Sequence, residues 1–257
     1  MKNIFGIVMM VSLMGLLSVM AQDVKPVKTE TVDLGNGINL EMALIPAGKF
    51  MMGSLEIEKK RQEDELQHEV TITKPFFMGK HEVTQEQWQA VMRNNPSEIK
   101  GTKLPVTNVS WVDCQEFIKK LNDKTNSGYC LPTEAEWEYA CRAETTTAYF
   151  FGNEITPKDS NFGDSNLGKA VNVGSKKANA YGLHDMHGNI WEWCEDWYGS
   201  YVEGKVTDPK GLEFGNRRSV RGGSFFDPGS DARSSNRYAV SPGSRNGYIG
   251  FRLVRAK

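Results

Sequence analysis

Three helix-start signals in the middle of the 257-residue chain constrain its fold more than any other feature. Each has a Ser or Thr followed three residues later by an acid or amide, the pattern of a capping box that satisfies free amide groups in the first helical turn. These pairs are Thr84 with Gln87, Ser110 with Asp113, and Thr133 with Glu136. Apolar residues follow each pair at helical spacing. The sequence therefore predicts three helices that begin just after residues 84, 110 and 133.

Strand-like segments lie on both sides of these helices. Residues 41–50 and 70–83 are rich in β-formers, the second interrupted by Pro75, and residues 218–225 and 248–254 predict two more strands. Residues 143–181 show no sustained period, which predicts a long irregular region held in place by its aromatic ends. No internal repeat or composition break marks a second domain. We therefore expect one compact, irregular α+β domain with little regular secondary structure.

The overall composition is that of a globular protein. Hydrophobic residues make up 39% of the chain, charged residues make up 25%, and the net charge is -1. Nucleic-acid binding needs clustered basic residues, so this near-neutral balance argues against a nucleic-acid partner.

The N-terminus has the pattern of a signal peptide. Lys2 precedes an apolar run, residues 4–19, and Val19-Met20-Ala21 offers a cleavage site. We expect a signal peptide at 1–21, a polar linker at 22–37 and the folded domain at 38–257. An uncleaved membrane anchor is the alternative, whereas no cysteine follows the run to carry a lipid. The expected product is bacterial, exported to the periplasm or secreted, with no transmembrane helix after cleavage.

Four cysteines follow: Cys114, Cys130, Cys141 and Cys194. An even number in an exported chain permits two disulfides, with three possible connectivities. Their spacing has no C-x-x-C pair and no histidine at ligand distance, which argues against zinc.

Seven phrases together resemble the formylglycine-generating, or sulfatase-modifying factor, family. In order they are IPAGKFMMGS (45–54), HEVTQEQW (81–88), LPVTNVSWVDC (104–114), LPTEAEWEYACR (131–142), YGLHDMHGNIWEWCEDWY (181–198), VRGGSF (220–225) and GFRLV (250–254). The resemblance covers nearly the whole chain after the signal peptide and implies a compact fold related to C-type lectins. Many relatives do not make formylglycine, so the fold alone does not assign a reaction.

The resemblance implies a calcium site in the GNIWEW phrase. Its ligands would be the side chains of Asp185 and Glu192 and the carbonyl oxygens of Gly188 and Ile190, the hard oxygen donors that calcium prefers. The structural alternative is that Asp185 caps a turn and Glu192 pairs with an arginine.

A second family calcium site would begin at Asn161-Phe162, but the later loop that completes it is shortened here. His184 and His187 lie three residues apart in a segment predicted to be turn and strand. A histidine pair without a third ligand is weak evidence for a transition metal, so we expect ordinary polar roles for both.

The family enzyme oxidises a substrate cysteine and holds copper(I) with two cysteines just beyond a Gly-Gly-Ser. Here Ser224 matches the active-site serine, but no cysteine lies between Cys194 and the C-terminus. The soft ligands that copper(I) needs are therefore missing. In some relatives, the position of Cys141 bridges to a C-terminal cysteine that is also absent here.

Two functions follow as hypotheses. The first is a calcium-stabilised, non-catalytic binding or scaffold module for an unknown protein or glycan partner. Its binding surface would include Trp191, Asp227, Arg233, Arg237, Tyr238 and Arg245, since aromatic and arginine side chains are favoured at interfaces. Pairing of these arginines with acids inside the fold is the alternative for each. The second hypothesis is a formylglycine-generating-type oxidase, or another nonheme metalloenzyme, with altered metal ligands.

Overall fold

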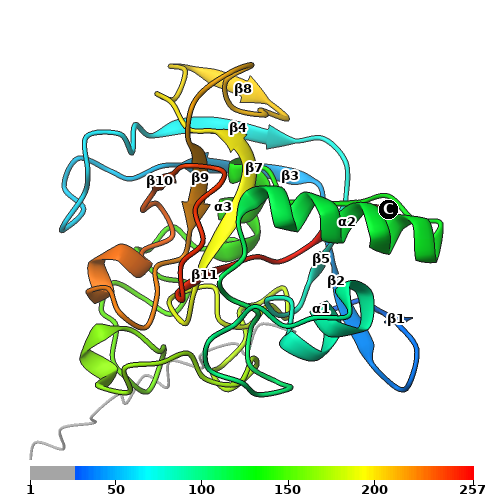
Figure 1. Cartoon of the computed structure of the whole chain (residues 1–257). Helices are drawn as coiled ribbons and strands as arrows, with labels where there is room; N and C mark the ends of the chain where they lie inside the picture. Colours follow the sequence, from blue (N-terminus) through cyan, green and yellow to red (C-terminus); the bar gives the residue numbers. More distant parts are fainter. Residues whose placement is uncertain (1–26) are drawn as a thin grey trace, which may run out of the picture.

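The computed structural model describes residues 27–257 as an α+β domain of three small sheets, three helices and long loops (Figure 1). The predicted signal peptide lies outside the described residues. The first sheet has five strands in the order β1-β2-β5-β12-β6. They are β1 (Thr29–Asp33), β2 (Asn39–Ile45), β5 (Phe76–Gly79), β12 (Val254–Ala256) and β6 (Tyr129–Cys130). Residues 29–33 therefore correct the predicted linker, because they pair with β2 along its whole length.

Two further sheets complete the framework. One has the order β10-β9-β7-β11, formed by β10 (Tyr238–Val240), β9 (Arg218–Arg221), β7 (Trp191–Trp197) and β11 (Ile249–Gly250). The other has the order β3-β4-β8, formed by β3 (Gly48–Met52), β4 (His68–Ile72) and β8 (Lys205–Thr207).

The first and third sheets share one long, bent antiparallel ribbon. Strand β2 pairs with β5, and after a kink at Pro46 the same chain continues as β3, paired with β4. The other half of the ribbon, formed by β4 and β5, has its own kink between these two strands, where Pro75 lies. Proline interrupts the hydrogen-bond ladder because it has no amide hydrogen.

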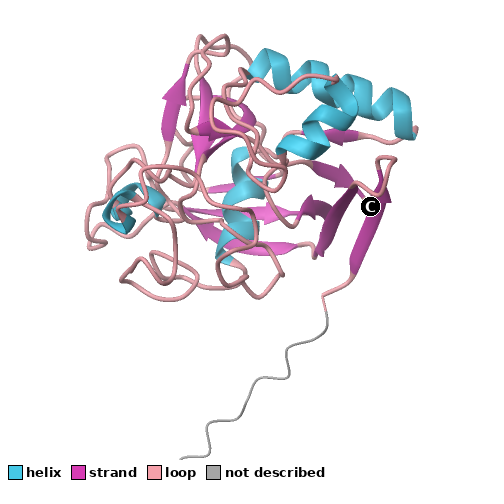
Figure 2. Cartoon of the chain, turned by 60° about the horizontal axis from the view of Figure 1, so that its bottom comes forward, coloured by secondary structure: helices cyan, strands magenta, loops and turns pink. Residues whose placement is uncertain are grey.

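All three predicted helices are confirmed: α1 (Gln85–Met92), α2 (Trp111–Thr125) and α3 (Glu134–Arg142). Their N-caps are Thr84, Ser110 and Thr133, and each capping box is formed in both directions. Figure 2 shows α1 and α2 together on one side of the molecule, while α3 lies among the strands. Two short 3-10 helices, η1 (Gly163–Ser165) and η2 (Gly229–Ala232), interrupt the loops. Within the described residues, 143–181 contains no other helix or strand, as the sequence predicts.

Two main hydrophobic clusters fill the interior. In the first, Trp88 stacks on Phe117 with ring centroids 5.2 Å apart, and Phe251 packs edge-on against both rings. The second surrounds α3 and contains Trp137, Tyr139 and neighbouring strand residues.

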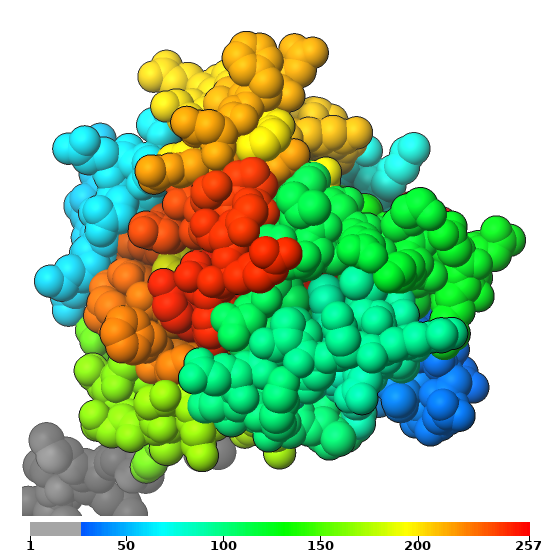
Figure 3. Space-filling view, viewed as in Figure 1, coloured from blue at the N-terminus to red at the C-terminus, as the bar shows by residue number. Residues whose placement is uncertain are grey.

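The chain's far segments meet on one face. Figure 3 shows the segments near residues 225–250, in orange and red, lying against the green segment that leads into α2. All four cysteines are free, so neither of the two permitted disulfides forms. No helix in residues 27–257 is long and apolar enough to cross a bilayer.

Candidate functional site

The GNIWEW phrase forms a tight turn that leads into β7. Asp185, Gly188 and Asn189 all have left-handed backbone angles, with φ of 57°, 93° and 67°. A Cβ on Gly188 would lie 2.4 Å from the carbonyl oxygen of Asn161 and 2.6 Å from Ser160 Oγ. Only glycine satisfies both the backbone angle and this close approach. The turn is therefore pressed against residues 160–161, which the sequence places far away.

Asp185 and Glu82 each present a buried carboxylate oxygen with no described partner. Asp185 Oδ2 accepts a 2.6 Å hydrogen bond from the Gly174 amide, and Glu82 Oε1 accepts a 2.8 Å bond from Asn189 Nδ2. Asp185 Oδ1 and Glu82 Oε2 accept none. Burial, followed by the charge of Asp185, raises the pKa of Glu82. Glu82 was not predicted as a site residue from the sequence, although it lies in the HEVTQEQW phrase.

Glu192 is bonded on both oxygens. Arg252 donates to it twice, at 2.6 Å from Nε and 2.6 Å from a terminal nitrogen, and Trp137 Nε1 donates at 2.7 Å. The pairing of Glu192 with an arginine, stated above as the structural alternative, is thus present. A carboxylate has about four acceptor positions, so the three hydrogen bonds from Arg252 and Trp137 leave Glu192 able to accept a further contact.

The oxygen donors around this turn suit a hard cation in kind. No described residue donates a hydrogen bond to the carbonyl oxygens of Gly188 or Ile190. Three carboxyl groups surround the turn, whereas Arg252 is the cation paired inside this cluster. Across residues 27–257, no three His, Cys, Asp or Glu side chains converge as a ready-made metal centre. Any cation would therefore rely on the carbonyls as well as the acids.

Asn161 and Phe162, the predicted start of a second calcium site, lie beside the same turn. Asn161 Oδ1 and Ser160 Oγ are buried without a partner, so all four unpartnered buried side-chain oxygens in the described residues belong to this neighbourhood. The Phe162 carbonyl instead accepts a 2.8 Å bond from the Ser165 amide. Of the two residues predicted to begin the second calcium site, only Asn161 therefore offers an oxygen without a hydrogen-bond partner, on its side chain.

The two histidines have separate environments. His184 Nδ1 lies 2.8 Å from the carbonyl oxygen of Lys176, and its ring stacks on His81 with centroids 4.9 Å apart. His187 is buried between the carbonyl of Ala232 and the amide of Phe150. Burial lowers the pKa of His187 to about 4, so the ring is neutral at pH 7. The two side chains do not form a shared metal site.

Ser224, the match to the family serine, is buried and bonded to Asp227. Its hydroxyl donates to Asp227 Oδ2, which also accepts a 2.8 Å bond from Trp191 Nε1. The structure thus brings together three residues that the sequence indicated as candidates for the site. No cysteine sulfur makes a polar contact with any of them among the described residues.

The predicted binding surface needs correction for its arginines. Arg233 and Arg237 are only 2% and 5% exposed, because each pairs with buried acids. Arg233 bonds both oxygens of Glu65, and Arg237 bonds both oxygens of Glu134. Trp191 is also buried, at 4% exposure. Tyr238 remains at the surface, and Arg245 pairs there with Asp113.

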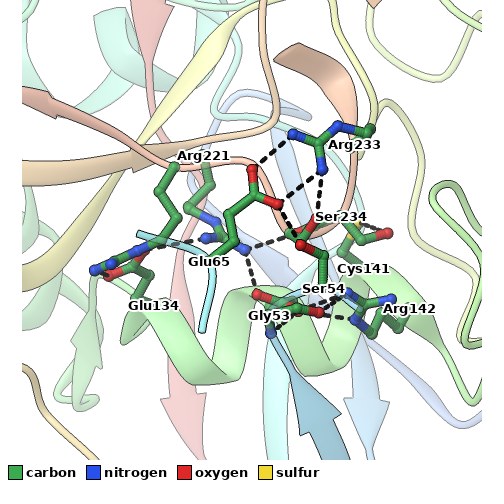
Figure 4. A network of polar contacts seen from close by, with 12 residues as sticks. Gly53, Ser54, Glu65, Glu134, Cys141, Arg142, Arg221, Arg233 and Ser234 are labelled. Atoms are coloured by element: carbon green, nitrogen blue, oxygen red, sulfur yellow. Dashed lines mark hydrogen bonds and ion pairs between the residues drawn. The ribbon is translucent and has the colours of Figure 1, made fainter. Parts of the chain in front are cut away.

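These pairs belong to an extended buried network around α3 (Figure 4). Arg221 forms ion pairs with Glu134 at 3.0 Å and with Glu138 at 2.6 Å, and Glu138 also pairs with Arg142 at 2.8 Å. Burial alone would raise the pKa of Glu134, but the charges of Arg237 and Arg221 lower it to about 2. The network joins α3 to the loop after β9 and to the segment near residue 65, so it is structural.

Exposed aromatic side chains lie close to the hydrogen-bonded residues Ser224, Asp227 and Trp191. Phe226 is 73% exposed and stacks on Tyr248, with centroids 6.2 Å apart, while Tyr238 is 58% exposed and lies 5.7 Å from Trp191. Beside Phe226 and Tyr248 is a groove of about 380 Å³, which Ile99 also lines. We call Phe226, Tyr238 and Tyr248 the aromatic cluster. Phe226 was not predicted from the sequence, because an isolated phenylalanine after GGSF carries no signal of exposure.

The fold and this constellation define a sulfatase-modifying-factor-like domain in which the cysteine pair is absent. Residues 36–257 match the sulfatase-modifying factor enzyme 1-like domain family, and the chain belongs to that family. The family resemblance and the α+β fold predicted from the sequence are both confirmed.

Individual relatives have different names and different lengths. The serine/threonine-protein kinase pkn1 of Chlamydia caviae is 32% identical over 246 residues, which cover 84% of this chain and 38% of that protein. The formylglycine-generating enzyme of Streptomyces coelicolor is 36% identical over 174 residues, covering 58% of this chain and 52% of the enzyme. The solved Treponema denticola variable protein 1 superposes with a TM-score of 0.82 at 28% identity, covering 89% and 99% of the two chains.

The chain thus spans 38% and 52% of the lengths of these two curated relatives.

Proposed function

We propose that this chain is an exported, calcium-stabilised binding module rather than a cysteine oxidase. The observation that carries this proposal is the arrangement around Ser224. Ser224 and Asp227 are hydrogen-bonded to each other, and the exposed aromatic cluster lies close to them. Aromatic side chains contribute large contact area at low entropic cost, so such a surface suits a protein partner.

The positions of the thiols support a non-catalytic role. Cys141 is buried, with its sulfur 3.7 Å from Ser234 Oγ, while Cys114 and Cys194 lie in the hydrophobic clusters. Burial raises the pKa of Cys141 to about 12, which keeps it a thiol at neutral pH. Copper(I) would need thiolates, and these buried thiols do not supply them.

Support for calcium comes from the turn at residues 185–192. The free oxygen of Asp185 and the unbonded carbonyls of Gly188 and Ile190 offer the donors that calcium prefers. Glu192 would contribute the lone pairs left by Arg252 and Trp137. A bound divalent cation would offset the excess negative charge of the carboxylates around this turn. Export rests on the apolar N-terminal segment and its cleavage pattern.

The binding role is tested with paired surface variants. The purified chain is immobilised and exposed to extracytoplasmic protein fractions, with a glycan array as a separate arm. Phe226→Ala with Tyr248→Ala should abolish retention of a saturable partner, because truncating central aromatic residues removes most interface energy. Phe214→Ala is the matched control, since Phe214 is 81% exposed and lies outside the aromatic cluster.

Equal retention by the double variant and the control would contradict the proposal, and binding only on the glycan array would replace the protein partner with a carbohydrate. The competing oxidase hypothesis has its own assay: copper(I), oxygen and a cysteine-containing sulfatase peptide. Aldehyde formation at a rate like that of a true family enzyme would overturn the non-catalytic assignment.

A further inference from the structure

Trp191 holds a carboxylate beside the aromatic cluster. Its indole Nε1 donates to Asp227 Oδ2 at 2.8 Å, its amide donates to the Tyr248 carbonyl at 2.9 Å, and its ring lies 5.7 Å from that of Tyr238. Phe226 completes the group, because its ring stacks on that of Tyr248. One buried tryptophan therefore fixes an acid and exposed aromatic rings from separate segments of the chain in one place.

The charge of Asp227 has no described counter-ion. Both hydrogen bonds to its carboxylate, from Trp191 and from the Ser224 hydroxyl, come from neutral donors and reach the same oxygen, Oδ2. Oδ1 accepts no hydrogen bond from the described residues, and it is not among the buried oxygens that lack a partner, so it lies at the surface. The arginines of the same loops pair with other acids, namely Arg233 with Glu58 and Glu65, Arg237 with Glu134, and Arg245 with Asp113.

Further negative charge lies near this carboxylate. Burial raises the pKa of Asp231, and the charge of Asp227 adds to that rise. Glu98 is exposed and is the only charged residue that lines the groove of about 380 Å³ beside Phe226 and Tyr248. Neither Asp231 nor Glu98 forms an ion pair with a described residue. The surface around the aromatic cluster is therefore both apolar and negatively charged.

The unpaired carboxylate decides which kind of partner fits this surface. An apolar group that covered the aromatic cluster would take Asp227 out of water without supplying a counter-ion, and burying an unpaired charge is unfavourable. A cation avoids this cost, because it pairs with the acid and is also attracted to the faces of aromatic rings.

We propose that Asp227 and the aromatic cluster form a cation-binding site for a lysine or arginine side chain of a partner protein, an inference that rests on the binding role proposed above. The carboxylate pairs with the cationic group, while Phe226, Tyr238 and Tyr248 contact the alkyl stem and attract the charge. Both basic side chains have an apolar stem that packs on such rings.

Arginine and citrulline test the charge requirement, because their side chains have nearly the same shape and only that of arginine is charged. Each is added to the purified chain as its Nα-acetyl amide, with Nα-acetyl-lysine amide as a third probe. Binding is followed by the NMR signal of the Trp191 indole N–H, which is assigned by its loss in Trp191→Phe.

We expect at least one charged probe to shift this signal saturably at millimolar concentration, and the shift to weaken as salt is added. Citrulline should bind at least about tenfold more weakly, because it lacks the charge that pairs with the acid. Binding of citrulline as strong as that of the charged probes, or no saturable shift with either charged probe, would overturn the proposal.

Asp227→Asn separates the charge of the carboxylate from its hydrogen bonds, because asparagine keeps an acceptor for Ser224 and Trp191. This variant should bind the charged probe at least about tenfold more weakly. Glu203→Gln, which removes an exposed acid elsewhere, should bind like the wild type. Tyr248→Leu should weaken binding and Tyr248→Phe should retain it, because the ring attracts the cation. Wild-type affinity in Asp227→Asn would contradict the cation site.

The partner-capture experiment separates this site from the binding role itself. Asp227→Asn should lose the retained partner, as should the double variant Phe226→Ala with Tyr248→Ala. A partner that Asp227→Asn still retains, but the aromatic double variant does not, would leave the binding role standing and rule out the cation site.

Discussion

Glu192 and Arg252 form a doubly hydrogen-bonded ion pair in the interior, with both contacts at 2.6 Å and side chains no more than 1% exposed. The pair links the GNIWEW turn to the C-terminal GFRLV phrase. Arg252 also donates to the carbonyls of Gly79 and His184, so it connects three segments that are distant in sequence.

Removing this guanidinium should be strongly destabilising. Arg252→Gln leaves Glu192 as a buried carboxylate without its cation, and breaking such a pair costs about 3–5 kcal/mol. The free energy of unfolding, measured by urea denaturation, should fall by that amount. Arg255→Gln is the matched control, because the Arg255–Glu30 pair is partly exposed and should change stability by only about 1 kcal/mol or less. Similar losses in both variants would contradict this account.

A comparison of alanine substitutions at Gly188 and Gly204 separates the cost of backbone strain from the cost of steric overlap. Both have nearly the same left-handed angle, with φ of 93° and 92°, but a Cβ on Gly204 meets nothing within 4 Å. Gly204→Ala should therefore cost only about 1–2 kcal/mol. Gly188→Ala should cost at least about 2 kcal/mol more, because its Cβ overlaps the Asn161 carbonyl. Equal thermal unfolding temperatures for the two variants would show that the turn is not pressed against residues 160–161.

Asp196 should make the protein less stable as pH rises. Burial, followed by the charge of Glu134, raises its pKa from 3.8 to about 8. A raised carboxyl pKa means that the unfolded chain ionises first, so stability is lost between about pH 4 and pH 8. Asp196→Asn keeps an acceptor for the Glu134 amide, which now bonds Asp196 Oδ2 at 2.8 Å.

The Asn variant should therefore be more stable than the wild type by a few kcal/mol at pH 8 to 9. Its advantage should shrink toward pH 4, and denaturation curves at several pH values measure both. An advantage that is independent of pH would sink the titration of Asp196 as the cause. Glu134, whose pKa is lowered to about 2, acts in the opposite direction, and its contribution is lost only below about pH 4.5.

Calcium should raise the melting temperature through Asp185. At a concentration one hundred times the dissociation constant, a single bound ion stabilises the folded state by about 2.7 kcal/mol. Chelation should remove that increment from the wild type, and Asp185→Asn should be insensitive to both calcium and chelator. Glu203→Gln, at an exposed position with no described hydrogen bond, should respond like the wild type. A wild-type melting temperature that chelation leaves unchanged would argue that no ion is bound.

Local chemistry accounts for what the sequence predicted well. The capping residues Thr84, Ser110 and Thr133 and their partners lie three residues apart, so the signal and the structure that it forms are both short-range. Pro75 likewise breaks its strand through the hydrogen bond that it cannot donate. The family phrases extended this local information to the whole fold. The missing copper ligands were equally visible, because the absence of later cysteines is a property of the sequence.

Tertiary structure decided which charged side chains meet and which remain at the surface. Arg233 and Arg237 were predicted to be contact residues from their residue type and position. Each is instead buried against an acid that is distant in sequence, 168 residues away for Arg233 and 103 residues away for Arg237. Glu82 joined the calcium candidate only because its loop, between β5 and α1, folds beside Asn189, 107 residues later. The sequence by itself therefore determined the helices, the family and the lost cysteines. Burial and long-range pairing depend on how the sheets close on one another, and they decided the charge network and the exposed aromatic cluster.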